Sequence, residues 1–347
     1  MEENNVFETY GQSDSIQISL CIPVYNVRPY LENLIDSIIS QNLTNISCEI
    51  LFVDDCSTDG SFEYLCENSR DMSNIRILRN DNNSGISYTR NRLIDNAKGE
   101  YIWFIDSDDM IYPNAIKVLL HIAKSNSADI VLANYIKVSE DACPIENIDI
   151  IDFEHRNVSF DNLDWLPDKD NNCRMLSMCR GIFKKSFLES NNLRFNEKVI
   201  MKEDALLYYE IGMKSPMTIK CEFPCYCVRQ RASSAMHGID ENKAMKYYSS
   251  SLALLEAYQR HLDNNNYNDV NKITALIEEE KEQLVKFLLR ISNSSFVRKQ
   301  LNFLRGRGLY PYKTKQKAFK NVHQFVDRLL PQSAFFWFIY FVYRVKR

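Results

Sequence analysis

Continuous apolar runs and amphipathic segments alternate along the first 135 residues. The apolar runs have little polar interruption, which is typical of strands buried on both faces, and the segments between them have helical spacing. This alternation predicts βαβ units that build a mostly parallel sheet with helices on both faces, an α/β fold. The expected strands are residues 18–26, 49–55, 74–80, 101–106 and 128–135.

The expected helices have recognisable starts and ends. Pro29 opens the first helix, since proline is favoured in the first helical turn. Ser84 is expected to cap the helix after the third strand, and Gly99 to end it. Later helices are expected at 202–211, 241–263 and 269–291, while residues 140–175 lose the periodicity.

Polar side chains stand where three of the predicted strands end. They are Tyr25-Asn26, Asp54-Asp55 and the run Asp106-Ser107-Asp108-Asp109. Parallel strands end at one edge of a sheet, and ligands of such sheets bind there. We therefore expect a ligand site at this edge.

Composition sets limits on the class of protein. The 347 residues are 45% hydrophobic and 25% charged, which excludes a disordered chain, a collagen and a polytopic membrane protein. The net charge of −4 argues against a general nucleic-acid binder. Residues 290–347, however, carry 13 basic side chains against one acid, so this end has a net charge of +12. A basic end on an acidic body favours an anionic partner for that end.

The ten cysteines do not resemble a disulfide framework. The polar start, MEENNVFETYGQSDS, has no apolar signal core, so we expect a cytosolic chain with reduced thiols. Cys221, Cys225 and Cys227 cluster, but a second pair of zinc ligands is missing. Buried thiols on a strand are favoured, with a metal site as the alternative.

Asp106 and Asp108 after a buried strand suggest a site for a hard divalent cation. Crowded carboxylates are costly unless a cation compensates them, and Mg²⁺ or Mn²⁺ with a bound diphosphate would do so. The alternative is a loop whose acids cap the next helix, which suits Asp109 best.

Other strand-end residues have similar double interpretations. Asp54 or Asp55 can accept the N3–H of a uracil ring, or the pair can shape a turn with Ser57. Tyr25 can offer a flat face to the base. Arg90 can reach a base or phosphate, or it is an exposed helix arginine.

The motifs together resemble the family 2 glycosyltransferases of the GT-A fold. The resemblance rests on CIPVYNVRPYLENLIDSIISQ, ILFVDDCSTDGS and NNSGISYTRNRLIDNAKGEYIWFIDSDD, in this order and spacing, and covers residues 16–135 closely. It implies nucleobase binding at Asp54 and Asp55, and ribose and metal binding at Asp106 and Asp108. It also implies that Pro23, Tyr25, Gly85 and Arg90 line the donor pocket.

The resemblance continues more loosely to about residue 235. It implies that Asp204, in RFNEKVIMKEDALLYYE, is the catalytic base; on local pattern alone, Glu203-Asp204 is a pair favoured by the helix dipole. Arg229 and Arg231 can bind diphosphate charge. His237 is either a further metal ligand or a surface histidine.

The resemblance implies an inverting transfer from a nucleotide-sugar, expected to be a UDP-sugar, with Mn²⁺ or Mg²⁺ as cofactor. The expected acceptor is a saccharide hydroxyl, lipid-linked, in capsule, O-antigen or exopolysaccharide assembly. The chain lacks the Gln-x-x-Arg-Trp motif of processive polymerases. The alternative is a catalytically inactive GT-A scaffold.

Two other classes of protein do not fit the sequence. A dinucleotide-binding oxidoreductase would need a Gly-x-Gly-x-x-Gly motif after the first strand, and this motif is absent. A signalling receiver domain begins near its acidic pair, whereas here a complete βα unit precedes that pair.

The expected organisation has four parts. Residues 1–15 are a flexible lead, 16–238 a GT-A domain (donor half 16–135, acceptor half 136–238), 239–330 a helical region and 331–347 an aromatic and basic tail. The run FFWFIYFVY is too short to span a bilayer but suits its interface. We expect peripheral attachment to the inner face of the cell membrane, with packing on the body or on a partner as the alternative.

Overall fold

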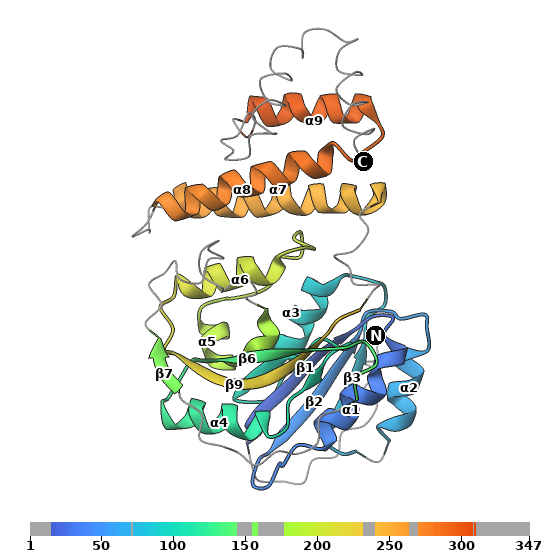
Figure 1. The fold of residues 1–347 in the computed structure, drawn as a ribbon, viewed down its shortest axis with the longest axis vertical. Coiled ribbons are helices and arrows are strands. Elements are labelled where there is room, and N and C mark those ends of the chain that lie inside the picture. The colour runs from blue at the N-terminus through green and yellow to red at the C-terminus, as the bar shows by residue number, and fades with distance from the viewer. Residues whose placement is uncertain are drawn as a thin grey trace. The chain divides into compact units, whose positions relative to one another are not determined.

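The computed structural model describes residues 15–70, 72–143, 155–158, 177–231, 240–263, 270–307 and 309. The chain divides into two compact units, Met1–His237 and Gly238–Arg347 (Figure 1). His237 and the tail 331–347 lie outside the described residues.

Strands and helices of the first unit alternate as the hydrophobic pattern predicts. The strands are β1 (Ile18–Val24), β2 (Cys48–Asp54), β3 (Ile75–Arg79), β4 (Tyr101–Phe104), β5 (Met110–Ile111), β6 (Ile130–Val138), β7 (His155–Val158), β8 (Gly181–Lys184) and β9 (Thr218–Arg229). The helices are α1 (Leu31–Ile39), α2 (Ser61–Asn68), α3 (Ile86–Asn96), α4 (Ala115–Ser125), α5 (Lys185–Ser190) and α6 (Glu203–Gly212).

The described strands form one sheet in the order β3-β2-β1-β4-β8-β6-β9-β5, with β7 paired to β9. Strands β3, β2, β1 and β4 are parallel, which confirms the prediction for this half. The other half is mixed, because β8 is inserted antiparallel between β4 and β6. In Figure 1, α3, α5 and α6 lie above the sheet and α4 lies below it.

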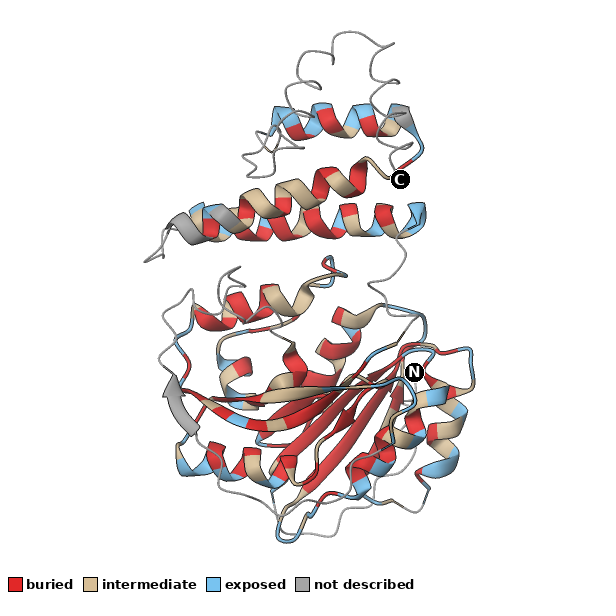
Figure 2. Cartoon of the chain, viewed as in Figure 1, coloured by how far each residue is buried: buried red, intermediate tan, exposed pale blue. Residues whose placement is uncertain are grey.

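The continuous apolar runs are explained by burial. Every residue of β1, β2 and β4 is buried, and these strands form the red centre of Figure 2. The one polar group of Trp103 is satisfied, since its indole N–H donates to the carbonyl of Cys179 at 2.8 Å. The sheet is therefore a rigid base from which the loops at its carboxyl edge project.

Two predicted helix ends are wrong. The residue before α3 is Gly85 with φ of 88°, and no side chain caps this helix; the Ser84 N–H is bound by Asp55 instead. At the other end, α3 stops at Asn96, before Gly99. A Cβ on Gly99 would lie 2.5 Å from the backbone nitrogen of Ser19, so glycine is required there by a close approach to β1.

The second unit contains the helices predicted at 241–263 and 269–291, observed as α7 (Glu241–Asp263) and α8 (Val270–Leu288), and also α9 (Ser294–Gly306). Ser251 of α7 donates to the buried Glu280 of α8 at 2.5 Å. Tyr248 of α7 donates to Gln300 of α9 at 3.0 Å. None of the helices described combines the length and apolarity that crossing a bilayer requires.

Candidate active site

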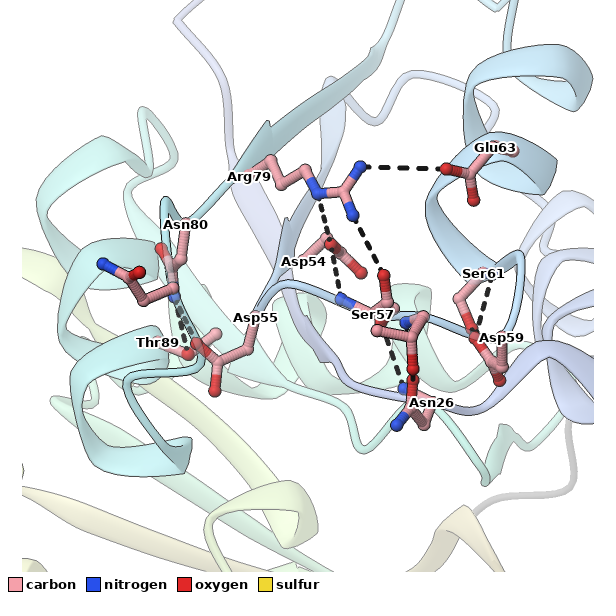
Figure 3. Close-up of polar contacts among 12 residues, drawn as sticks. Asn26, Asp54, Asp55, Ser57, Asp59, Ser61, Glu63, Arg79, Asn80 and Thr89 are labelled. Atoms are coloured by element: carbon pink, nitrogen blue, oxygen red, sulfur yellow. Dashed lines mark hydrogen bonds and ion pairs between the residues drawn. The ribbon is translucent and has the colours of Figure 1, made fainter.

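Asp55, just after β2, fixes the loop that leads into α3. Its carboxylate accepts the backbone N–H groups of Ser84 and Gly85, both at 2.8 Å. It also accepts the Asn80 side chain at 2.7 Å (Figure 3). The residue is 4% exposed. These bonds hold Gly85, whose φ is positive at 88°, at the carboxyl edge of the sheet.

Asp54 makes the contacts of a turn residue. Its Oδ2 accepts the Ser57 N–H at 3.0 Å and lies 3.2 Å from Nε of Arg79 (Figure 3). Its Oδ1 is buried with no partner among the described residues. Asn26, after β1, accepts the Thr58 N–H at 2.9 Å, so the loops that follow β1 and β2 are tied together.

Pro23 and Tyr25 lie at the end of β1. Pro23 is buried in the strand, and its missing N–H is tolerated because pairing with β4 ends at Cys21. Tyr25 is 47% exposed, which leaves its ring open to a ligand.

Arg90 joins two predicted motifs that are far apart in the sequence. Its guanidinium donates to Asp106 at 2.8 Å and to Glu203 at 2.7 Å. The arginine is 5% exposed, so the alternative of an exposed helix arginine is wrong. The carboxylates of Asp106 and Glu203 raise the pKa of Arg90 above its ordinary value, against the effect of burial. The start of α6 is thereby held beside the end of β4.

Asp204, in the first turn of α6, has a raised pKa. Burial and then the charge of Glu203 raise its pKa from 3.8 to about 7. Its Oδ1 accepts the Ala205 N–H at 2.8 Å. Both acids lie in the first turn of α6, as the helix-dipole interpretation requires, but Glu203 is bound by Arg90.

The acidic run after β4 is anchored by residues of β9. Tyr226 accepts the Asp106 N–H at 2.9 Å, and Asp109 accepts the Arg229 N–H at 2.7 Å. Asp109 does not cap α4, which has Asn114 before its first residue, so the capping alternative is wrong. Burial and the neighbouring Asp108 raise the pKa of Asp109 to about 8.

Arg229 and Arg231 differ in what holds them. The Arg229 guanidinium donates to the carbonyls of Asp108 at 2.9 Å, Glu140 at 2.5 Å and Ala142 at 3.1 Å, and the residue is 5% exposed. These bonds make it a support of the loop, while its Nη2 is buried without a partner among the described residues. Arg231 forms an ion pair with Asp108.

Asp106 and Asp108 fit a cation shared with a nucleotide. Across the described ranges, no three His, Cys, Asp or Glu side chains are grouped to hold a metal by themselves. Mg²⁺ sites, however, commonly use one or two carboxylates plus substrate phosphates. Burial and Asp106 raise the pKa of Asp108, and the cation that faces it among the described residues is Arg231.

The cysteine cluster on β9 behaves as buried thiols. Cys221, Cys225 and Cys227 are all free and buried. Burial raises the pKa of Cys227 to about 12 and that of Cys225 still higher. Neither thiol is therefore ionised at neutral pH.

Sequence reasoning missed two residues of this site, Tyr226 and Asn80, and the contact of Glu203 with Arg90. Tyr226 holds the Asp106 backbone, Asn80 holds Asp55, and Glu203 pairs with Arg90. Asn80 had a usable signal, because it follows a predicted strand as Asp54 and Asp55 do. The Tyr226 contact had none, since its partner is 120 residues away.

Comparison with known proteins gives a consistent result. Residues 19–189 match the family model described as Glycosyl transferase family 2. Glycosyltransferase GlyG of Streptococcus pneumoniae serotype 4 is 39% identical over 124 residues, 35% of this chain and 40% of that protein. Poly(ribitol-phosphate) beta-N-acetylglucosaminyltransferase TarP of Staphylococcus aureus is 26% identical over 237 residues, 67% of this chain and 69% of that protein.

Not all relatives are matched over their full length. The poly(ribitol-phosphate) beta-glucosyltransferase of Bacillus spizizenii is 28% identical over 226 residues, and the match spans 64% of this chain but a third (33%) of that protein. Among solved structures, S. aureus TarS 1–349 in complex with UDP-GlcNAc has a TM-score of 0.56 at 18% identity, covering 88% of this chain and 92% of that one. This likeness confirms the GT-A fold.

Proposed function

We propose that this chain, whose residues 19–189 match the family 2 glycosyltransferase model, transfers a sugar from a nucleotide-sugar to a hydroxyl of a saccharide acceptor in bacterial surface-polysaccharide assembly. The observation that carries the proposal is the Arg90 bridge. One buried guanidinium joins Asp106 of the acidic motif to Glu203, the neighbour of Asp204. A donor-binding group and a base are thus held at one edge of the sheet.

The proposed reaction is a single displacement with inversion. Asp204 takes the proton of the acceptor hydroxyl as its oxygen attacks the anomeric carbon, and the bond from that carbon to the diphosphate breaks. The pKa of about 7 supports this role, because a base is most effective when its pKa is near the working pH.

Donor binding is assigned to the strand ends. The exposed ring of Tyr25 stacks on the base, and Asp54 or Asp55 accepts its N–H. A UDP-sugar is the proposed donor, a choice supported by the TarS complexes with UDP and UDP-GlcNAc. Asp106 and Asp108 hold Mn²⁺ or Mg²⁺, which when bound neutralises the charge of the departing diphosphate.

The proposed acceptor is a lipid-linked saccharide or polymer at the cytoplasmic face of the membrane. The poly(ribitol-phosphate) transferases among the relatives support a surface polymer as acceptor class. The tail 331–347, with FFWFIYFVY beside Arg344, Lys346 and Arg347, is proposed to attach the chain to that face.

The test is a thermal-shift panel of UDP, GDP, TDP and CDP, each with and without Mn²⁺, on the wild type and Asp108→Ala. A ligand that binds the folded state raises its stability by mass action. We expect a Mn²⁺-dependent shift with UDP that Asp108→Ala loses. If no nucleotide shifts the melting temperature and no UDP-sugar is hydrolysed, the proposal of an active enzyme is rejected in favour of the inactive GT-A scaffold.

A further inference from the structure

We propose that Arg231 is an internal counter-cation: it holds Asp108 in the donor-free protein and moves to the donor diphosphate when a divalent cation binds Asp108. This inference rests on the proposed function and goes beyond it, because it makes metal binding depend on the nucleotide. The observation behind it is the Arg231–Asp108 ion pair at one of the two carboxylates assigned to the cation.

The two arginines at the end of β9 are not equivalent. Arg229 is fixed by bonds to three backbone carbonyls and is nearly fully buried. In the part of the chain that is described, the side-chain contacts of Arg231 are the ion pair with Asp108 and the face of the Tyr30 ring, 5.2 Å away. Its side chain is 23% exposed. Arg231 is thus the arginine that can change partner without breaking the loop.

Charge explains why such a residue is needed. Four consecutive residues contain three carboxylates, those of Asp106, Asp108 and Asp109. The Asp108 side chain is only 18% exposed. Arg90 compensates Asp106, and Arg231 compensates Asp108. A cation arriving alone must displace a tethered guanidinium and leave it without a partner. A cation arriving with a diphosphate supplies that partner, since arginine binds phosphate through paired charge-assisted hydrogen bonds.

Binding of the cation and the nucleotide is therefore coupled, and the coupling is reciprocal. Removing the Arg231 guanidinium should have opposite effects on cation binding and on nucleotide binding. The carboxylate becomes available to a cation alone, while the diphosphate loses one of its donors. A residue with a merely structural role would weaken both.

The experiment is a Mn²⁺ titration followed by electron paramagnetic resonance on the full chain, with and without UDP. For Arg231→Gln we expect Mn²⁺ alone to bind about fivefold more tightly than to wild type, equivalent to about 1 kcal/mol. UDP in the presence of Mn²⁺ should bind about tenfold more weakly. Arg231→Lys keeps the charge and should leave the affinity for Mn²⁺ alone near that of wild type.

Controls separate this idea from the function on which it rests. Arg194→Gln removes the same charge from an exposed pair with Asp95 and should change neither affinity. Suppose that the melting temperature shows Arg231→Gln to be folded but that it binds Mn²⁺ alone no better than wild type does. The proposed counter-cation role of Arg231 is then refuted, while the proposed transferase function is not. If wild type binds no Mn²⁺ even with UDP, both are refuted.

Discussion

Asp204 is a half-buried, poorly solvated carboxyl beside a second carboxyl, and this raises its pKa to about 7. We expect kcat/KM to rise about tenfold per pH unit up to about pH 7 and then level off, because the ionised form is the base. Asp204→Asn should lower kcat by a factor of about 10² to 10⁴. A pH profile of donor turnover measures both, and a profile that is flat from pH 5 to 8 would contradict the assignment.

The same shift has a consequence for stability. The pKa of Asp204 is higher in the folded protein than in the unfolded chain. Its contribution to the free energy of unfolding is therefore fully present below the pKa of the unfolded chain, and it is lost as the pH rises through about 7. Asp204→Asn should therefore melt at a higher temperature than wild type at pH 8, with little difference at pH 4. Asp95→Asn, at an exposed carboxyl, serves as the control. Equal effects of Asp204→Asn at both pH values would contradict the shift.

Arg90 is predicted to be coupled to Glu203. Arg90→Met leaves two carboxylates without their cation and should cost about 3 kcal/mol of unfolding free energy. Adding Glu203→Gln should restore at least about 1 kcal/mol of it, because one of the unpaired charges is removed. Urea unfolding of the two single variants and the double variant measures the coupling. Strict additivity would show that the contact carries no energy.

At the scale of elements, the sequence predicts well where one hydrophobic pattern decides. The parallel strands β1 to β4 are visible because burial on both faces demands continuous apolar runs. β5 and β8 were missed because each has only two consecutive large apolar residues, Met110–Ile111 and the central pair of GIFK, whereas the four residues of β4, YIWF, are all apolar. The predicted start of α3 failed because Asp55 binds the N–H groups of Ser84 and Gly85, which makes Gly85 the residue before the helix, while the Ser84 hydroxyl donates to the carbonyl of Asn82. The Arg90 contacts were out of reach, as Glu203 is 113 residues away.

The insertion of β8 depends on a glycine. A Cβ on Gly181 would lie 1.9 Å from the carbonyl oxygen of Val131 on β6. Since that contact is with backbone, Gly181→Ala should separate the strands and cost at least about 3 kcal/mol. Gly60→Ala is the matched control: its φ of 85° is unfavourable, but nothing lies within 4 Å of its Cβ. That variant should cost about 1 kcal/mol. Calorimetry of both variants tests whether Gly181→Ala loses more stability than Gly60→Ala. A Gly181→Ala variant as stable as Gly60→Ala would refute the prediction.

For the whole molecule, the division at residue 237 separates the proposed chemistry from the basic end. The described residues of the candidate site all lie in Met1–His237, which has its own buried core around Trp103. Charge is divided too, because the net +12 falls on residues 290–347. Sequence alone indicates this contrast, since counting charges needs no tertiary contact. If the proposed function holds, donor binding and surface attachment belong to different units of the chain and are separable by truncation.

A fragment of residues 1–237 tests that separation. It should melt cooperatively and bind UDP with Mn²⁺ within about threefold of the full chain, because it keeps every described site residue. It should fail to sediment with anionic lipid vesicles that the full chain binds, since each basic residue near such a surface contributes about 1 kcal/mol. The same fragment with Asp108→Asn controls for non-specific nucleotide binding. A folded fragment without UDP affinity would place part of the donor site beyond residue 237, and a fragment that still sediments would assign membrane binding to the catalytic unit.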